Sequence, residues 1–204
     1  MGGFMDAARA AFTDIYVHDR WGLSRMQPNQ DRLAGYATLV QEFMRCNDIH
    51  SVAEFGCGFW TYAKLIDWTG ITYDGYDVVP LVISWNTQRH GAANIRFREL
   101  TDSTKPAPVD LVICKDVLQH LPNDDVARLL PLLKQTAPLL LIINDVMPDS
   151  NTNGPIERGG YRAIQLDQAP FGEACMTLHE WESVDFGVTC RKRAVLVRGM
   201  PRPA

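Results

Sequence analysis

A short glycine-containing segment and an aspartate further along the chain are the residues whose spacing most clearly suggests chemistry. Glu54-Phe55-Gly56-Cys57-Gly58 follows an apolar run, and Asp77 lies in the next apolar run, 19 positions after Gly58. Glycines let a backbone approach a ligand closely, and a carboxylate on the neighbouring strand can accept hydrogen bonds from both hydroxyls of a ribose. The pattern predicts a nucleotide-binding site at the carboxyl ends of two adjacent parallel strands.

Short apolar runs separated by helical stretches must position these residues. The runs predict strands over Ser51–Phe55, Thr72–Val79, Ile95–Leu100, Val109–Cys114 and Pro138–Val146. Two further strands, Ala174–Trp181 and Lys192–Arg198, are joined by a segment too short for a crossover helix, so they should pair antiparallel at one edge. The fold class is therefore α/β: a doubly wound, mostly parallel seven-stranded Rossmann-like sheet with an antiparallel edge strand and helices on both faces.

Segments outside these strands complete a single predicted domain. Apolar residues at helical spacing predict two N-terminal helices, and Asn123 begins a helix that Pro131 should kink or restart. The stretch Met147–Gly160 is a long loop rich in proline and glycine, which together with the N-terminal helices is expected to form a lid. We expect N-terminal helices over 1–48, a cofactor-binding core over 49–146, a substrate loop over 147–171 and C-terminal strands over 172–199.

Composition excludes several classes of protein. The 204 residues have a formal net charge of −4, with 46% hydrophobic and 22% charged residues, which is typical of one globular domain. An acidic chain without an extended basic stripe is not expected to bind nucleic acid, and the cluster Arg191-Lys192-Arg193 is expected to protect an edge strand from association. No apolar run is long enough to span a membrane, and the five scattered cysteines predict neither disulfides nor a metal site, so we expect a cytoplasmic protein.

The sequence around the predicted nucleotide-binding site resembles that of the class I S-adenosylmethionine-dependent methyltransferases. The resemblance rests on the turn Glu54–Gly58, on Asp77, and on Lys115-Asp116-Val117-Leu118-Gln119-His120-Leu121-Pro122, which is similar to the "D-V-L-x-H-L-P" segment of that family. A dinucleotide fingerprint would instead need a small residue at Thr61. The family often has a third glycine where this chain has Trp60.

The resemblance implies S-adenosylmethionine as cofactor and a set of binding residues. Gly56 and Gly58 would contact the methionine and ribose, Glu54 would hold the turn or the ammonium group through water, and Asp77 would bind the ribose hydroxyls. Val78 would lie against the adenine, and Asp102 would accept a hydrogen bond from the adenine amino group. Further candidates for cofactor contact are Lys115, Trp21 and Arg25.

Candidates for the reacting site lie after the fourth and fifth strands and in the flanking segments. Methyl transfer from a sulfonium is a displacement at an activated carbon, so a base is required only if the acceptor must lose a proton. The candidate catalytic residues are His120, Asp116 and Asp145. The candidate substrate-binding residues are Tyr16, Asn144, Tyr161 and Arg162. For each of these a structural role is open: a hydrogen bond for His120, an ion pair for Lys115 and Asp116, core packing for the aromatic residues.

The sequence predicts methyl transfer to the oxygen or nitrogen of a small molecule, without naming the acceptor or the oligomeric state. A non-catalytic binding or assembly protein with the same fold is the main alternative. A nicotinamide-dependent oxidoreductase is disfavoured because no tyrosine is followed four residues later by lysine. An amino-methylating nucleic-acid enzyme would carry a Pro-Pro-Tyr or Pro-Pro-Phe motif where Lys115 begins a different sequence.

Overall fold

The computed structural model describes residues 3–21, 30–146, 151–185 and 188–201. Its seven strands form one sheet with the order β3-β2-β1-β4-β5-β7-β6. By their internal contacts the residues divide into two compact units, 1–105 and 106–204. The predicted fold class, a mostly parallel seven-stranded sheet with antiparallel strands at one edge, is confirmed.

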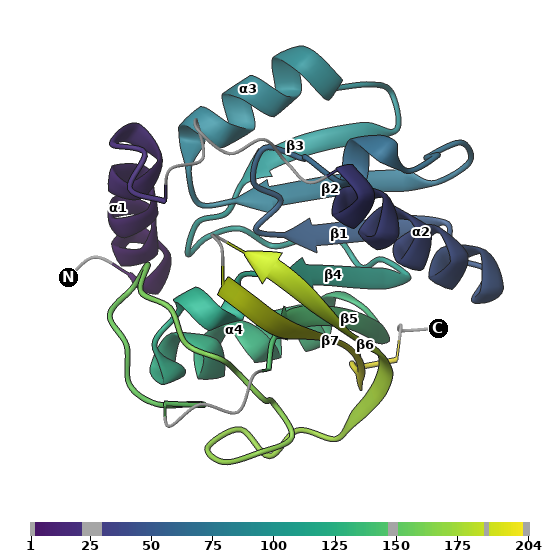
Figure 1. The fold of residues 1–204 in the computed structure, drawn as a ribbon. Helices are drawn as coiled ribbons and strands as arrows, with labels where there is room; N and C mark the ends of the chain where they lie inside the picture. The colour runs from purple at the N-terminus through teal and green to yellow at the C-terminus, as the bar shows by residue number, and fades with distance from the viewer. Residues whose placement is uncertain (1–2, 22–29, 147–150, 186–187, 202–204) are drawn as a thin grey trace. The chain divides into compact units, whose positions relative to one another are not determined.

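The first unit holds a parallel sheet of three strands, β3-β2-β1, and three α-helices (Figure 1). Its elements are α1 (Phe4–Val17), α2 (Gln30–Cys46), β1 (Ser51–Phe55), a 3-10 turn (Ala63–Leu65), β2 (Thr72–Asp77), α3 (Pro80–His90) and β3 (Ile95–Glu99). Ser51 pairs with Thr72 and Tyr73 with Ile95, so the three strands end at the same edge. That edge carries the residues predicted to bind the cofactor.

Helix α1 lies across the carboxyl ends of β1 to β3 (Figure 1). Near its start the backbone N–H of Met5 donates to Asp102, which follows β3, and Arg9 forms an ion pair with Glu99 at the end of β3. Further along, the ring of Tyr16 contacts that of Phe59 in the turn after β1, with centroids 5.3 Å apart. The helix is therefore fastened to the edge where a nucleotide was predicted to bind.

The second unit holds β4, β5, β7 and β6 in that order, with one long helix. Its elements are β4 (Leu111–Lys115), a 3-10 turn (Leu118–His120), α4 (Asn123–Thr136), β5 (Leu139–Asp145), β6 (Cys175–Asp185) and β7 (Val188–Arg198). The antiparallel pairing of the last two strands is confirmed, and β6 is the edge strand. The expectation that Arg191-Lys192-Arg193 protects an edge is wrong, because β7 pairs with β5 on one side and with β6 on the other.

Helix α4 continues through Pro131 without restarting. Proline cannot donate to the carbonyl four residues earlier, which here belongs to Ala127. Both residues are exposed, so water can take the place of the missing donor. The buried side chains of the helix include Val126, Leu129 and Leu133, which form an apolar stripe along one side of it.

The segment 151–174 contains neither helix nor strand, yet its described residues are held in place by specific contacts. Asn153 adopts a left-handed backbone conformation with φ of 55°, and its side-chain amide donates to the carbonyls of Gln165 and Ala169 at 2.8 Å. Arg158 donates with two nitrogens to the buried carboxylate of Asp125 at the start of α4. These contacts favour a fixed conformation of the described residues. The lid expected over 147–160 remains a prediction, and residues 147–150 lie outside the described part.

Candidate functional site

The turn after β1 is built on two glycines in the left-handed region. Gly56 has a φ of 73° and Gly58 a φ of 50°, values that most other residues adopt only with strain. The backbone N–H groups of Gly56 and Cys57 donate to the carbonyl of Tyr76 at 2.8 and 3.0 Å, which ties the turn to the end of β2. The turn is thus fixed beside Asp77, as the sequence spacing predicted.

Asp77 at the end of β2 faces the glycine turn and is 7% exposed. One carboxylate oxygen accepts the N–H of Gly58 at 3.1 Å, and the other accepts the N–H of Val79 at 3.0 Å. Burial raises the pKa of Asp77 to about 6, although these hydrogen bonds oppose the rise. Each oxygen has a second acceptor site, so the carboxylate can still bind two hydroxyl donors.

Glu54 lies in the middle of a buried hydrogen-bond network rather than at the surface of the turn. The hydroxyl of Tyr62 donates to one of its oxygens at 2.7 Å, and the hydroxyl of Tyr73 donates to the other at 2.5 Å. The carboxylate is 2% exposed, and its negative charge contributes to raising the pKa of Tyr73 well above its usual value, after burial itself. Of the two roles predicted for Glu54, holding the turn is the one these contacts favour.

A tyrosine of α1 contacts the turn, and a tryptophan that follows the helix packs against this tyrosine. The rings of Tyr16 and Trp21 lie with centroids 6.1 Å apart, and a side chain added at Gly58 would meet the Tyr16 hydroxyl at 3.5 Å. Burial, and then the nearby carboxylate of Asp77, raise the pKa of Tyr16 well above its usual value, so the hydroxyl stays protonated and can donate. Tyr16 is thus brought to the turn, with Trp21 beside its ring. Val78 follows Asp77 and is half-buried, and Arg25 lies outside the described residues.

Asp102 meets α1. Its carboxylate accepts the N–H of Met5 at 3.2 Å, and a side chain added at Gly3 would collide with it. A carboxylate at a helix N-terminus satisfies an unpaired N–H and interacts favourably with the helix dipole. The structure therefore gives Asp102 a capping role across 97 positions of sequence, and its predicted contact with adenine stays a prediction.

In the second unit, charged residues meet where β4 and β5 end. The ammonium of Lys192 lies 2.9 Å from an oxygen of Asp116 and 2.7 Å from an oxygen of Asp145, and Lys115 pairs with Asp116 at 2.5 Å. Burial alone would raise the pKa of Asp116, but the two lysines outweigh it and hold this pKa well below its usual range. Asp116 is therefore a permanent anion and a poor proton acceptor. The role of Lys192 was not predicted from the sequence. The only indication in the sequence is that Asp116 and Asp145, two acids at strand ends, require a positively charged partner.

His120, in the 3-10 turn after β4, lies near these charged residues. Its Nδ1 lies 2.8 Å from the carbonyl of Gly160, which can only accept, so Nδ1 carries the proton and Nε2 is the basic nitrogen. Burial lowers the pKa of His120, which keeps the imidazole neutral at neutral pH. The ring of Tyr161 lies beside it with centroids 6.0 Å apart, and the Tyr161 hydroxyl donates to Asp145 at 3.1 Å. His120, Tyr161 and Asp145 are therefore brought together.

Two predicted substrate-binding residues point away from this group. Arg162 is 1% exposed, and its guanidinium donates to the carbonyl of Leu118 at 3.1 Å and to the side chain of Asn123 at 2.7 Å. These bonds fasten the segment around Arg162 to the start of α4. Asn144 pairs with Arg193 in the register of β5 and β7, so its side chain lies on the opposite face of the sheet from Asp145.

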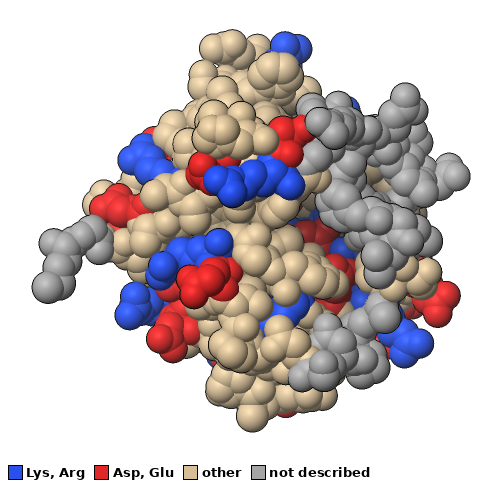
Figure 2. All heavy atoms as spheres, turned by 60° about the vertical axis from the view of Figure 1, so that its left-hand side comes forward, with Lys and Arg blue, Asp and Glu red and all other residues tan. Residues whose placement is uncertain are grey.

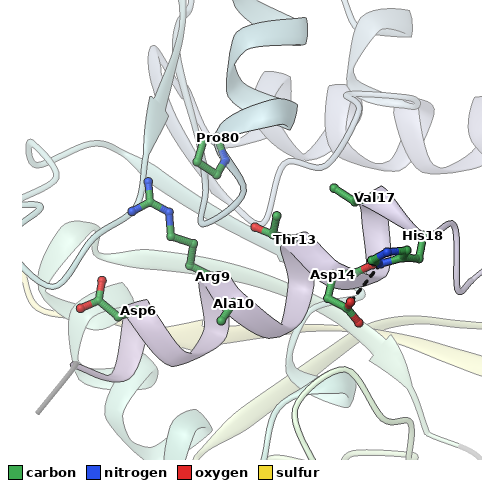
Figure 3. A pocket seen from close by; sticks show the side chains of 8 residues that line it. All are labelled: Asp6, Arg9, Ala10, Thr13, Asp14, Val17, His18 and Pro80. Atoms are coloured by element: carbon green, nitrogen blue, oxygen red, sulfur yellow. Dashed lines mark hydrogen bonds and ion pairs between the residues drawn. The ribbon is translucent and has the colours of Figure 1, made fainter.

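An open pocket of about 560 Å³ lies between α1 and Pro80 (Figure 3). It is lined by Asp6, Arg9, Ala10, Thr13, Asp14, Val17, His18 and Pro80. Tyr16 is absent from this lining although it belongs to α1, and so are the glycine turn and Asp77. Within the described ranges no group of three or more His, Cys, Asp or Glu could hold a metal ion, and no helix is both long and apolar enough to cross a membrane.

No protein-family model matches the sequence, and no curated protein matches it. Solved structures do match. The magnesium protoporphyrin IX methyltransferase ChlM from Synechocystis PCC 6803, with bound S-adenosylmethionine, has a TM-score of 0.65 at 14% identity, covering 93% of this chain and 97% of that one. The fold is that of the S-adenosylmethionine-dependent methyltransferases. A complex of DhpI with S-adenosylhomocysteine has a TM-score of 0.62 at 17% identity over 98% of both chains.

Within this methyltransferase fold, Trp60 stands where the sequence family often has a third glycine. Its φ of 56° is the left-handed conformation that a glycine would adopt. The indole is 5% exposed and lies among the rings of Trp68, Tyr73, His90 and Phe97, with centroid distances of 4.9 to 6.4 Å. The backbone at Trp60 therefore has the conformation that a glycine would adopt, and the large side chain lies in the core.

The described residues fit the nucleoside part of such a cofactor. Asp77 offers buried carboxylate acceptors to ribose hydroxyls, and Gly56 and Gly58 allow close approach of a ligand to the backbone. Each oxygen of Asp77 accepts one backbone N–H, from Gly58 and Val79, and a carboxylate oxygen can accept more than one donor.

Proposed function

We propose that this protein binds S-adenosylmethionine at the glycine turn and transfers its methyl group to a small-molecule acceptor. The single observation that carries the proposal is the buried Asp77 carboxylate, which accepts the N–H of Gly58 in the glycine turn at 3.1 Å. When bound, the cofactor supplies an activated methyl carbon. The match in fold to structures that hold S-adenosylmethionine or S-adenosylhomocysteine supports the same proposal.

The residues of the first unit would bind and orient the cofactor. Asp77 would accept the ribose hydroxyls, the backbone of Gly56 and Gly58 would lie along the methionine and ribose, and the Tyr16 hydroxyl would donate to a polar group near Gly58. In the second unit, neutral His120 with its basic Nε2 would accept a proton from the acceptor, while Tyr161 would contact the acceptor through its half-exposed ring. Lys115 and Asp116 would not take part in proton transfer; their ion pair would keep Asp116 charged beside the acceptor site.

Charge distribution favours a small acceptor over a nucleic acid. On the face shown in Figure 2, basic and acidic side chains are interspersed among the coloured atoms, with no continuous basic stripe. The basic run on β7 is partly neutralised, because Lys192 pairs with Asp116 and Asp145, and Arg193 pairs with Glu180. Phosphate backbones are bound by lysines and arginines that remain available to them.

Calorimetric titration with S-adenosylmethionine and S-adenosylhomocysteine tests the proposal, followed by methyl-transfer assays on small hydroxyl and amino compounds and on mixed nucleic acids. We expect saturable binding of both cofactor forms at one site. Absence of binding heat and of any thermal shift with both compounds would overturn the proposal. Binding without turnover on any acceptor would favour a non-catalytic binding protein, and robust methylation of a polynucleotide would refute the small-molecule assignment.

Replacing Asp77 by alanine is expected to weaken binding of S-adenosylhomocysteine by about 1.5 to 3 kcal/mol, or roughly 10- to 150-fold, since charge-assisted hydrogen bonds to the ribose are lost. Calorimetry measures the loss. Asp67→Ala removes an exposed carboxylate of the same unit and should leave the affinity unchanged. Wild-type affinity in a folded Asp77→Ala protein would show that this acid does not contact the ligand.

The affinity should also depend on pH through Asp77. Its pKa is about 6 in the free protein, and ribose hydroxyls favour the ionised form, so binding releases a proton below pH 6. Affinity is therefore constant above about pH 6 and falls by about tenfold per pH unit below it. Titrations from pH 5 to 8 check this, and Asp77→Asn should remove the dependence. The same slope in Asp77→Asn would place the titrating group elsewhere.

A further inference from the structure

Lys192 on β7 is buried, and its ammonium pairs with carboxylates at the ends of two other strands, β4 and β5. Its side chain is 2% exposed, and the carboxylates it joins belong to Asp116, 26% exposed, and Asp145, 3% exposed. Asp145 is its direct neighbour in the register of β5 and β7, whereas Asp116 directly follows β4, which lies on the far side of β5. One ammonium therefore fixes the ends of both strands.

Through Asp116, Lys192 acts on the backbone that leads to His120. Asp116 has a φ of 55°, a strained conformation for a non-glycine residue, which persists only where its surroundings enforce it. Its N–H donates to the carbonyl of Ile143 at 2.8 Å, and its side chain is held by Lys115 and Lys192. The chain then turns through Leu118–His120, so the position of the imidazole depends on this anchored residue.

Through Asp145, Lys192 acts on the two side chains that flank the imidazole. The second oxygen of Asp145 accepts the amide N–H of Gln119 and the hydroxyl of Tyr161, both at 3.1 Å. Gln119 also accepts the backbone N–H of Asp145 at 2.8 Å. Gln119 precedes His120 in sequence and Tyr161 lies beside its ring, so both are oriented by a carboxylate that Lys192 holds.

We propose that Lys192 is a positioning residue, which orients His120 and Tyr161 for the acceptor by joining the carboxylates of Asp116 and Asp145. This role rests on the proposed function in one respect: the acceptor molecule on which His120 and Tyr161 would act. A contribution to stability is a weaker explanation, since a buried ion pair is often no more stabilising than apolar residues of similar volume. A lysine that joins two strand ends instead specifies geometry, because losing it leaves the buried carboxylate of Asp145 without this counter-charge and leaves Asp116 paired with Lys115 alone.

The proton affinity of His120, followed by NMR in protein without cofactor or acceptor, tests this role. The charged groups that act on the imidazole are Asp116 and Asp145, which raise its pKa, and Lys192, which lowers it. In Lys192→Met we expect the proton affinity of His120 to rise by about threefold to tenfold, and the Tyr161 ring signals to shift, since the carboxylates are no longer held. Lys192→Arg keeps the charge and should restore values within about twofold of the wild type.

Lys134→Met is the matched control. It removes the ion pair with Glu173 from the same unit, which does not involve His120, and should leave the His120 titration unchanged. If Lys192→Met does not fold, Lys192→Gln gives the same comparison with an N–H donor retained. If that variant also fails, Asp145→Asn carries the test, with an expected fall in His120 proton affinity.

The titrations are made without cofactor, so their result does not depend on whether the protein binds S-adenosylmethionine. A changed titration that Lys192→Arg restores and Lys134→Met does not reproduce supports the proposal. A wild-type titration with wild-type Tyr161 signals in folded Lys192→Met or Lys192→Gln, or an unchanged His120 in Asp145→Asn, overturns it. Failure to bind S-adenosylmethionine would refute the proposed function while leaving these titrations interpretable.

Discussion

Replacing Glu54 by leucine should lower the free energy of unfolding by about 2 to 6 kcal/mol, because two buried tyrosine hydroxyls each lose their acceptor at about 1 to 3 kcal/mol. The hydroxyls belong to Tyr62 and Tyr73, and the carboxylate between them is 2% exposed. Urea unfolding followed by fluorescence measures the loss. The effect is large because the side chain that disappears is the shared partner of both hydroxyls.

A combined variant separates this explanation from simple loss of packing. When Glu54→Leu is combined with Tyr62→Phe and Tyr73→Phe, both hydroxyls are removed together with the carboxylate that accepts from them, and removing both partners of a buried hydrogen bond can be nearly neutral. We therefore expect the triple variant to be more stable than Glu54→Leu. A triple variant less stable than the single one would show that the hydroxyls find other acceptors and that the carboxylate stabilises the fold in another way.

Replacing Trp60 by glycine should lower the free energy of unfolding by about 2 to 4 kcal/mol. Truncation of a buried tryptophan costs about 3 to 5 kcal/mol, and relief of a left-handed backbone at a non-glycine residue returns about 1 kcal/mol. The affinity for S-adenosylhomocysteine should stay near the wild-type value, since the indole lies among aromatic rings of the core. Urea unfolding and calorimetry measure the two quantities.

Trp60→Phe is the control for this prediction. It keeps an aromatic ring in the core and removes an indole N–H that, among the described residues, makes no hydrogen bond. The variant should therefore lose less stability than Trp60→Gly. A Trp60→Gly protein as stable as the wild type would mean that the aromatic contacts contribute little, and a marked loss of affinity would place the indole at the ligand after all.

The strands of the parallel part could be predicted closely because buried parallel strands appear as nearly continuous apolar runs. The predicted range Ser51–Phe55 matches β1, and Pro138–Val146 exceeds β5 by one residue at each end. The antiparallel pair was underestimated: β6 continues to Asp185 and β7 begins at Val188. The added residues pair across strands through polar partners such as Glu182 with Arg191, and an apolar pattern cannot detect such pairs.

The candidate site was predictable where local spacing determines it. The glycine turn and Asp77 are joined by a hydrogen bond, as the spacing required. Contacts that depend on how distant segments pack were not predictable: the capping of α1 by Asp102 spans 97 positions, and the pairing of Lys192 with Asp116 spans 76. Arg162 was chosen for its charge, but its guanidinium binds a backbone carbonyl and an asparagine in the interior.

Strand β7 is synthesised after both of the strands between which it lies. While it is missing, β5 and β6 each present an unpaired edge, and direct pairing of these two edges would exclude β7. The same strand carries Lys192, so until it inserts, Asp116 and Asp145 lack the ammonium that joins them. Completion of the sheet and assembly of the charge network are therefore one folding event, and an intermediate that stops short of this step keeps two strand edges unpaired and open to aggregation.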